Sequence, residues 1–236
     1  MMLKIGHRGA AAHAPENTLA SFRRAVELGA DAIEFDLHRT RDGGFVVIHD
    51  DTVDRTTNGH GKVAALSLAE LRRLDAGSWK ASEFAGERIP TFEEVIEAVP
   101  ERVTLFAELK AGSARSPGIE DALARFIRER NVMDRLRVSS FDHRALARLR
   151  PLLPELQTGA LFTCLPVDLV ALGRNAGAQA VHPSFHYLTR DAVEEAHRAG
   201  LAVYAWTVNE PTDIDAVRAM GVDGMFSDHP DRLRWD

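Results

Sequence analysis

Hydrophobic and polar positions alternate along this chain in a repeated order, in which a helical stretch ends at a glycine and a short apolar run follows. The order is clearest around four glycines: Gly29, Gly177, Gly200 and Gly221. A glycine takes the left-handed conformation that often ends a helix at little cost, and parallel strands are usually joined by a helix. The pattern therefore predicts repeated β/α units around a parallel sheet.

Eight apolar runs have the length of strands. They lie near residues 2–6, 31–37, 103–109, 135–139, 156–161, 179–182, 201–206 and 223–227. Eight is the strand number of a TIM-type (β/α)8 barrel, and 236 residues come close to the roughly 250 that such a barrel needs. We therefore expect an α/β fold with a single barrel domain over residues 1–236.

One further apolar run, at residues 45–49, does not fit the eight-strand order. It follows Asp42-Gly43, a pair that favours a tight turn, and so predicts a hairpin partner for the second strand. Residues 51–90 then hold turn signals and one short helix around 66–74, which is too much for a simple loop. We expect this stretch to be a small cap inserted after the second strand region.

Helix starts are marked by residues that can accept hydrogen bonds from free backbone amides. Asn17 is expected to cap the first helix, and the pairs Ser67/Glu70 and Thr91/Glu94 fit capping boxes. These signals agree with the positions of the predicted helices.

Carboxylates occupy alternate positions of two predicted strands. In Ile33–Leu37 the apolar residues share one face and Glu34 and Asp36 share the other, and Glu108 and Lys110 likewise share one face of the third barrel strand. If the apolar faces pack on helices, the charged faces point toward the barrel axis. They lie near the carboxyl ends of the strands, where barrel enzymes keep their active sites.

Three buried carboxylates would repel one another unless a cation joined them. An all-oxygen set without a thiol suits Mg²⁺ or Ca²⁺ better than Zn²⁺. The sequence therefore predicts a divalent cation held by Glu34, Asp36 and Glu108. On the strand pattern alone, the first two could equally lie on an exposed edge or pair with arginines.

Two histidines also come at predicted strand ends, His7 in His7-Arg8-Gly9 and His49 in His49-Asp50. Histidine accepts and donates protons near neutral pH, and cleavage of a phosphodiester needs both a proton acceptor and a proton donor. We expect Arg8 and Lys110 to hold phosphate oxygens, with Gly9 allowing a close approach of the backbone to the ligand.

Trp206 ends a later strand, where it can pack on a small alcohol. The remaining histidines receive no role: His13, His38, His60, His143, His182, His186, His197 and His229.

Composition excludes several other classes. The formal net charge of −6 argues against general binding of nucleic acid. No run of about 18 apolar residues is present, and the chain enters a predicted strand at once, so we expect a cytoplasmic protein without a signal peptide. The single cysteine, Cys164, allows no intrachain disulfide and is expected to be a small buried side chain.

Seven short motifs in barrel spacing resemble the glycerophosphodiester phosphodiesterase family over nearly the whole chain. They are His7-Arg8-Gly9, Pro15-Glu16-Asn17-Thr18, Glu34-x-Asp36, His49-Asp50, Glu108-x-Lys110, Trp206-Thr207-Val208-Asn209 and Asp223-Gly224-Met225-Phe226-Ser227-Asp228. The stretch that begins at Arg55 resembles the insertion which that family carries after its second histidine.

The resemblance implies metal-dependent hydrolysis of small glycerophosphodiesters to glycerol 3-phosphate and an alcohol, a step of glycerol and lipid metabolism. It implies a metal on Glu34, Asp36 and Glu108 and acid/base roles for His7 and His49. Substrate contacts would come from Arg8, Lys110 and Trp206. Both water and the 2-hydroxyl of the glycerol are compatible with the sequence as the nucleophile.

Two other functions remain open at this point. A lysophospholipase D or sphingomyelinase D type enzyme would need an apolar entrance, for which Trp79 and Phe84 are available. A non-catalytic barrel that binds glycerol phosphates would not need the two histidines. The leaving alcohol, the cation and the oligomeric state are not encoded in any pattern that we can interpret.

Overall fold

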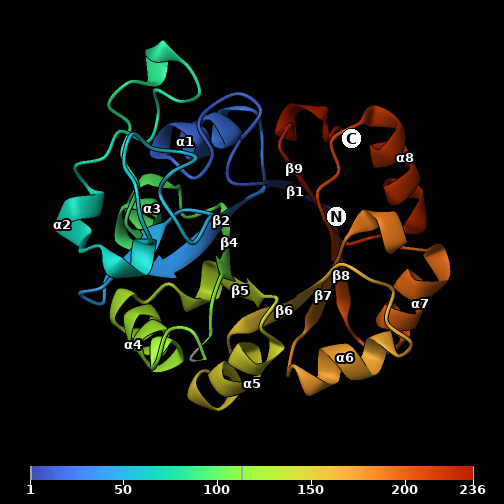
Figure 1. The fold of residues 1–236 in the computed structure, drawn as a ribbon. Coiled ribbons are helices and arrows are strands. Elements are labelled where there is room, and N and C mark those ends of the chain that lie inside the picture. The colour runs from blue at the N-terminus through green and yellow to red at the C-terminus, as the bar shows by residue number, and fades with distance from the viewer. Residues whose placement is uncertain (1, 113, 236) are drawn as a thin grey trace.

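The computed structural model describes residues 2–112 and 114–235, and its centre is a closed barrel of eight parallel strands (Figure 1). These strands are β1 (Leu3–Gly6), β2 (Ala32–Arg39), β4 (Thr104–Leu109), β5 (Leu136–Ser140), β6 (Gln157–Phe162), β7 (Ala180–Pro183), β8 (Ala202–Ala205) and β9 (Gly224–Ser227). The barrel closes because β1 pairs in parallel with both β2 and β9. The predicted (β/α)8 barrel is therefore confirmed.

Helices surround the barrel and lie outside the ring of strands (Figure 1). They are α1 (Leu19–Glu27), α2 (Leu68–Leu71), α3 (Phe92–Ala98), α4 (Ile119–Arg130), α5 (His143–Leu152), α6 (Leu169–Asn175), α7 (Arg190–Arg198) and α8 (Pro211–Met220). Within the part of the chain that the structure describes, no helix is long and apolar enough to cross a bilayer.

The ninth apolar run forms β3 (Phe45–Val47), which pairs antiparallel with β2 as predicted. The stretch between β3 and α3 extends away from the barrel, at the upper left of Figure 1, and has a small apolar cluster of its own that includes Val53, Val63 and Leu71. The helix expected around residues 66–74 is only the single turn α2. Contacts with the β1–α1 loop hold this stretch in place, since Lys80 donates to the Ala11 carbonyl at 2.8 Å.

Side chains alternate across the barrel wall as the sequence predicts. Ile33, Phe35 and Leu37 of β2 belong to the large apolar cluster under the helices, together with Leu105, Ala107 and Leu109 of β4. The interior near the amino ends of the strands is filled by a second cluster that includes Ile5, Phe106 and Phe226. Glu34, Asp36 and Glu108 therefore lie above this cluster, toward the carboxyl ends of the strands, whereas Arg137 and His182 pack against its rings.

Two local expectations are wrong. The cap of α1 is Thr18, whose side chain accepts from Ser21 N, whereas Asn17 has a left-handed backbone with φ of 59° and points into the barrel. Cys164 is exposed rather than buried. The capping boxes Ser67/Glu70 and Thr91/Glu94 are both present.

Candidate active site

Three carboxylates meet at the carboxyl end of the barrel. Asp36 of β2 and Glu108 of β4 are register partners, and Glu34 lies on the same inward face of β2. One oxygen from each of the three side chains lies within 4.8 Å of the other two, and Glu34 and Asp36 are almost fully buried. The exposed-edge alternative for Glu34 and Asp36 is therefore excluded.

This carboxylate cluster is electrostatically strained without a cation. Burial and the charges of Asp36 and Glu108 raise the pKa of Glu34 well above its ordinary value. Burial and Asp36 likewise raise the pKa of Glu108 to about 7. Burial opposes ionisation of Asp36 as well, but Lys110, Arg8 and His49 lower the pKa of Asp36 below its usual value. A bound cation would remove the mutual repulsion of these groups.

Asn17 supports the cluster from the β1–α1 loop. Its side-chain amide donates to Asp36 Oδ2 at 2.7 Å and accepts from the Asp36 backbone at 3.3 Å. These two bonds fix the orientation of the most buried carboxylate.

The first predicted histidine, His7, is held by an aspartate from the other end of the chain. His7 Nδ1 lies 2.7 Å from Asp228 Oδ1, and Asn209 donates to the other oxygen of Asp228 at 2.8 Å. His7 Nε2 lies 4.0 Å from Glu34 Oε2. The aspartate therefore directs the second ring nitrogen toward the carboxylate cluster.

The second histidine, His49, is held in the same way, with Nδ1 2.6 Å from Asp50 Oδ1. Burial, and the positive charges of Arg8 and Lys110, lower the pKa of His49. Its imidazole is therefore suited to act as a neutral base near pH 7.

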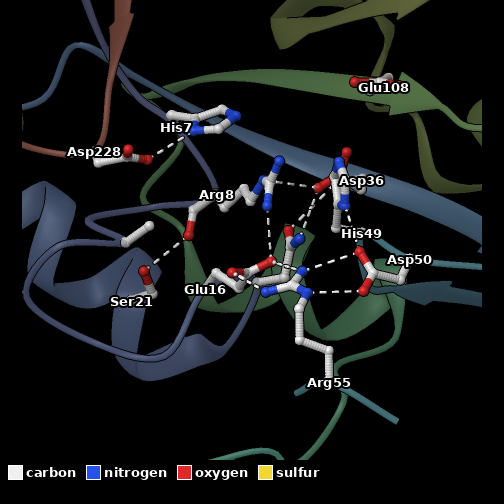
Figure 2. Close-up of polar contacts among 12 residues, drawn as sticks. His7, Arg8, Glu16, Ser21, Asp36, His49, Asp50, Arg55, Glu108 and Asp228 are labelled. Atoms are coloured by element: carbon white, nitrogen blue, oxygen red, sulfur yellow. Dashed lines mark hydrogen bonds and ion pairs between the residues drawn. The ribbon is translucent and has the colours of Figure 1, made fainter. Parts of the chain in front are cut away.

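A chain of ion pairs joins His49 to Arg8, and Figure 2 shows it as a line of dashed contacts. Arg55 binds Asp50 at 2.8 and 3.0 Å and binds Glu16 at 2.7 and 2.8 Å. Glu16 then accepts from Arg8 Nη1 at 2.8 Å. The chain runs from His49 through Asp50, Arg55 and Glu16 to Arg8, and it fixes the positions of all five side chains.

The two predicted phosphate-binding cations border the carboxylates. Lys110 Nζ lies 2.9 Å from Glu108 Oε1 and 3.4 Å from Asp36 Oδ1. Arg8 Nε lies 3.5 Å from Asp36 Oδ2, and the buried Nε atom has no hydrogen-bond partner among the described residues. Both side chains also line the cavity above the carboxylates, where their charges can meet a ligand oxygen.

A cavity of about 100 Å³ opens above this arrangement. Its lining includes His7, His49, Glu34, Glu108 and Lys110. The same cavity is lined by Arg8, Trp206 and Phe141, and the two aromatic rings meet edge to face with centroids 5.6 Å apart. The predicted catalytic, metal-binding and substrate-binding residues thus lie in or beside one cavity, since Asp36 lies 3.5 Å from Arg8 and 3.4 Å from Lys110.

Several residues of the site received no role from the sequence. Asp228, Asp50 and Asn209 orient the two histidines, and Glu16 and Arg55 link them to Arg8. Glu16, Asp50, Asn209 and Asp228 lie within the motifs quoted above, which was the only signal available. Gly9 also has a packing role that the sequence did not indicate, because its missing side chain makes room for Ser21 of α1, whose Oγ would lie 2.4 Å from a Cβ there.

The donor set fits a hard divalent cation. Three carboxylate oxygens can bind one ion and leave positions for ligand oxygens, as Mg²⁺ and Ca²⁺ require. Two aspartate-held imidazoles face the same space, so one proton can be removed and another delivered there. The arrangement is therefore chemically suited to metal-assisted hydrolysis of an ester of a phosphate.

Comparison with known proteins identifies phosphodiesterases as the relatives of this chain. The model of the Glycerophosphoryl diester phosphodiesterase family matches residues 7–232. A glycerophosphodiester phosphodiesterase of Caldanaerobacter subterraneus subsp. tengcongensis is 42% identical, over 98% of this chain and 96% of its own. One from Bacillus subtilis is 31% identical, over 98% of this chain and 84% of its own.

Two solved structures resemble the fold closely. An Oleispira antarctica phosphodiesterase in complex with the product sn-glycerol-3-phosphate has a TM-score of 0.90 and 33% identity, with 97% of this chain and 94% of that chain covered. A glycerophosphodiester phosphodiesterase from Agrobacterium tumefaciens has a TM-score of 0.86 and 28% identity, with 99% of each chain covered.

Proposed function

Because this chain belongs to the glycerophosphoryl diester phosphodiesterase family, and is an enzyme of that kind, we propose that it cleaves glycerophosphodiesters into glycerol 3-phosphate and an alcohol with a bound divalent cation. One observation carries the proposal: Glu34, Glu108 and the two aspartate-held histidines line a single cavity, and an oxygen of Asp36 lies within 4.8 Å of oxygens of both glutamates. The product named for the Oleispira antarctica relative supports glycerol 3-phosphate as the product here.

Glu34, Asp36 and Glu108 would hold the cation, Mg²⁺ or Ca²⁺. The ion would supply positive charge next to the phosphate oxygens, on which negative charge builds up during the reaction. Lys110 stands beside the same carboxylates and would neutralise a non-bridging oxygen, as would the guanidinium group of Arg8, which lines the cavity.

The two histidines would carry the protons. Asp228 and Asp50 each bind Nδ1, so Nε2 of each ring is the atom available for transfer. One imidazole removes the proton of the attacking hydroxyl while the other protonates the departing alkoxide. The lowered pKa of His49 favours it as the base.

The attacking group is water or the glycerol 2-hydroxyl. Attack by the 2-hydroxyl forms a cyclic phosphate, which phosphorus NMR detects during turnover. A substrate without the 2-hydroxyl keeps its rate if water attacks and loses it otherwise.

The test is release of glycerol 3-phosphate from glycerophosphocholine by the purified chain, with EDTA, Mg²⁺ or Ca²⁺ added. We expect activity only with a cation, and losses of about 10²-fold or more in His7→Ala and His49→Ala. His197→Ala is the matched control, because His197 forms a similar pair with Asp223 at 2.8 Å but lies on the surface. Full activity in EDTA, or in both site variants, would overturn the proposal.

One observation favours a lipid diester as a second substrate. Among the described residues, four of the five exposed large hydrophobic side chains lie on loops at the carboxyl end of the barrel: Phe141, Leu165, Val167 and Tyr187. Phe141 also lines the cavity itself. An apolar entrance would therefore come from these loops and not from Trp79 and Phe84, since neither of those two residues lines the cavity.

The ratio of rates on a lysophospholipid and on glycerophosphocholine tests this second substrate. An apolar contact with the lipid chain predicts that Phe141→Ala lowers the lysophospholipid rate about tenfold and leaves the other rate nearly unchanged. Trp79→Ala, which removes an exposed aromatic outside the cavity, should change neither. Equal losses on both substrates would exclude a lipid-binding role for Phe141.

A further inference from the structure

Two histidines and one aspartate outside the catalytic cavity lie close together. His13 belongs to the loop between β1 and α1, whereas His229 and Asp231 follow β9. One ligand atom of each side chain lies within 4.8 Å of the other two. His13 Nε2 and Asp231 Oδ1 are 2.7 Å apart, and the two imidazoles meet edge to face with centroids 5.6 Å apart.

We propose that His13, His229 and Asp231 bind a divalent transition-metal ion such as Zn²⁺, at a site separate from the carboxylate cluster. Two imidazole nitrogens and one carboxylate oxygen are ligands typical of Zn²⁺, Co²⁺ and Ni²⁺. Mg²⁺ and Ca²⁺ instead prefer oxygen alone, as in the carboxylate cluster. The chain would therefore hold two ions of different chemical preference.

The spacing fits such an ion after small side-chain rotations. Ligand atoms in a tetrahedral zinc site are about 3.4 Å apart, as follows from metal–ligand distances of about 2.1 Å. The 2.7 Å between His13 Nε2 and Asp231 Oδ1 is shorter than this distance. The largest separation between ligand atoms of the three side chains, at most 4.8 Å, is longer. Binding would replace the proton that His13 and Asp231 share. The side chains of both are about one third exposed, so an ion can enter and water can complete its shell.

The backbone positions of the ligands are already fixed. His13 N donates to Ala10 O at 2.8 Å, and His229 O accepts from Arg232 N at 2.9 Å. The positive charge of Arg232 is engaged elsewhere, because its Nη1 donates to Asn209 O at 2.8 Å and lies 3.6 Å from Glu210 Oε1. The charge of Arg232 still lowers the pKa of His229, and Arg234 Nε donates to the backbone carbonyl of Asp231 at 2.9 Å, so neither arginine pairs with the Asp231 carboxylate.

An ion at this site would join the two segments that carry one catalytic pair. Ala12 N, next to His13, donates to the carbonyl of Asp228, next to His229, at 3.1 Å. Asp228 is the residue that holds His7. The ion would thus fasten the His7 loop to the Asp228 segment without touching the substrate, and would stabilise the folded chain.

The experiment is calorimetric titration of the full chain with Zn²⁺ in excess Mg²⁺, which fills the carboxylate cluster. Four proteins are compared: wild type, His13→Ala, His229→Ala and the control His197→Ala. His197 also pairs with an aspartate, Asp223, but among the described residues it belongs to no group of three potential metal ligands. We expect wild type and the control to bind one Zn²⁺ at least tenfold more tightly than the other two. The Zn²⁺-dependent rise in melting temperature should disappear in the same two variants.

Two further measurements make the result unambiguous. Asp36→Asn, which damages the carboxylate cluster, should leave this Zn²⁺ binding intact. X-ray absorption at the zinc edge of wild type, which needs no variant to fold, should show two imidazoles. Equal Zn²⁺ binding in all four proteins, loss of binding only in Asp36→Asn, or a zinc shell without imidazole would overturn the proposal.

Discussion

His7 and Asp228 are separated by 221 positions in the chain, yet His7 Nδ1 lies 2.7 Å from Asp228 Oδ1. The pairing of β1 with β9 brings them together, because each residue follows directly after one of these neighbouring strands. Closure of the barrel thus assembles the pair, and the aspartate sets which nitrogen of His7 faces the cavity.

Asp228→Asn should therefore impair catalysis more than folding. The amide can keep a hydrogen bond but favours the wrong ring tautomer, and we expect kcat to fall by about 10²-fold or more. Steady-state rates and the melting temperature measure the two effects. Asp223→Asn, in the surface pair with His197, should retain activity; a similar loss of activity there would mean that the effect is not specific to His7.

Asn17 has a double role that two substitutions can separate. Asn17→Gly keeps the left-handed backbone possible and removes only the bonds to Asp36, so we expect weaker metal binding with little loss of stability. Asn17→Ala adds backbone strain and should cost a further 1 kcal/mol or so in the free energy of unfolding. Denaturant unfolding and metal titration measure these effects, and equal stability of the two variants would contradict the backbone argument.

In the proposed reaction, Lys110 would compete with the cation for the carboxylates and would also stabilise the phosphate. We predict that Lys110→Met binds the cation more tightly, by up to about tenfold, because the contacts to Glu108 and Asp36 are lost. The value of kcat/KM should nevertheless fall by about 10²-fold or more. Weaker cation binding in this variant would show that Lys110 positions the carboxylates instead.

The free energy of unfolding of the metal-free protein should depend on Glu108. Glu108 titrates near 4.5 when unfolded and at about 7 when folded, so between these values only the folded chain binds the proton. Its contribution to stability is therefore present below pH 4.5 and is lost as the pH rises toward about 7. The loss is of the order of 3 kcal/mol.

Comparison with Glu108→Gln tests this contribution, since the lowered pKa of His49 acts in the opposite direction in both proteins. Loss of the Glu108 charge also lowers the pKa of Glu34, which reduces the pH-dependent loss of stability in the variant in the same sense. Urea unfolding in EDTA between pH 4.5 and 7.5 should show the wild type losing stability relative to the variant. A saturating concentration of the cation should make the free energy of unfolding of the two proteins depend on pH in the same way. Parallel pH profiles in EDTA would mean that Glu108 is ionised throughout.

Much of this structure follows from local sequence patterns. Strand alternation is local, so the inward direction of Glu34, Asp36 and Glu108 could be predicted from their apolar neighbours. The partners of the histidines could not, because Asp228 meets His7 only through barrel closure. Asn17 shows why helix-capping preferences do not always predict the cap. An asparagine before a helix usually caps it, but here Asn17 bonds to the buried Asp36, and Thr18 caps the helix.

The position of the cation tests the central claim most directly. Crystals grown with Ca²⁺ or Mn²⁺ should give one anomalous peak with an oxygen of each of Glu34, Asp36 and Glu108 within about 2.1–2.6 Å. The peak should disappear in Asp36→Asn together with turnover. Full cation-dependent turnover with no peak between these three side chains would contradict the account.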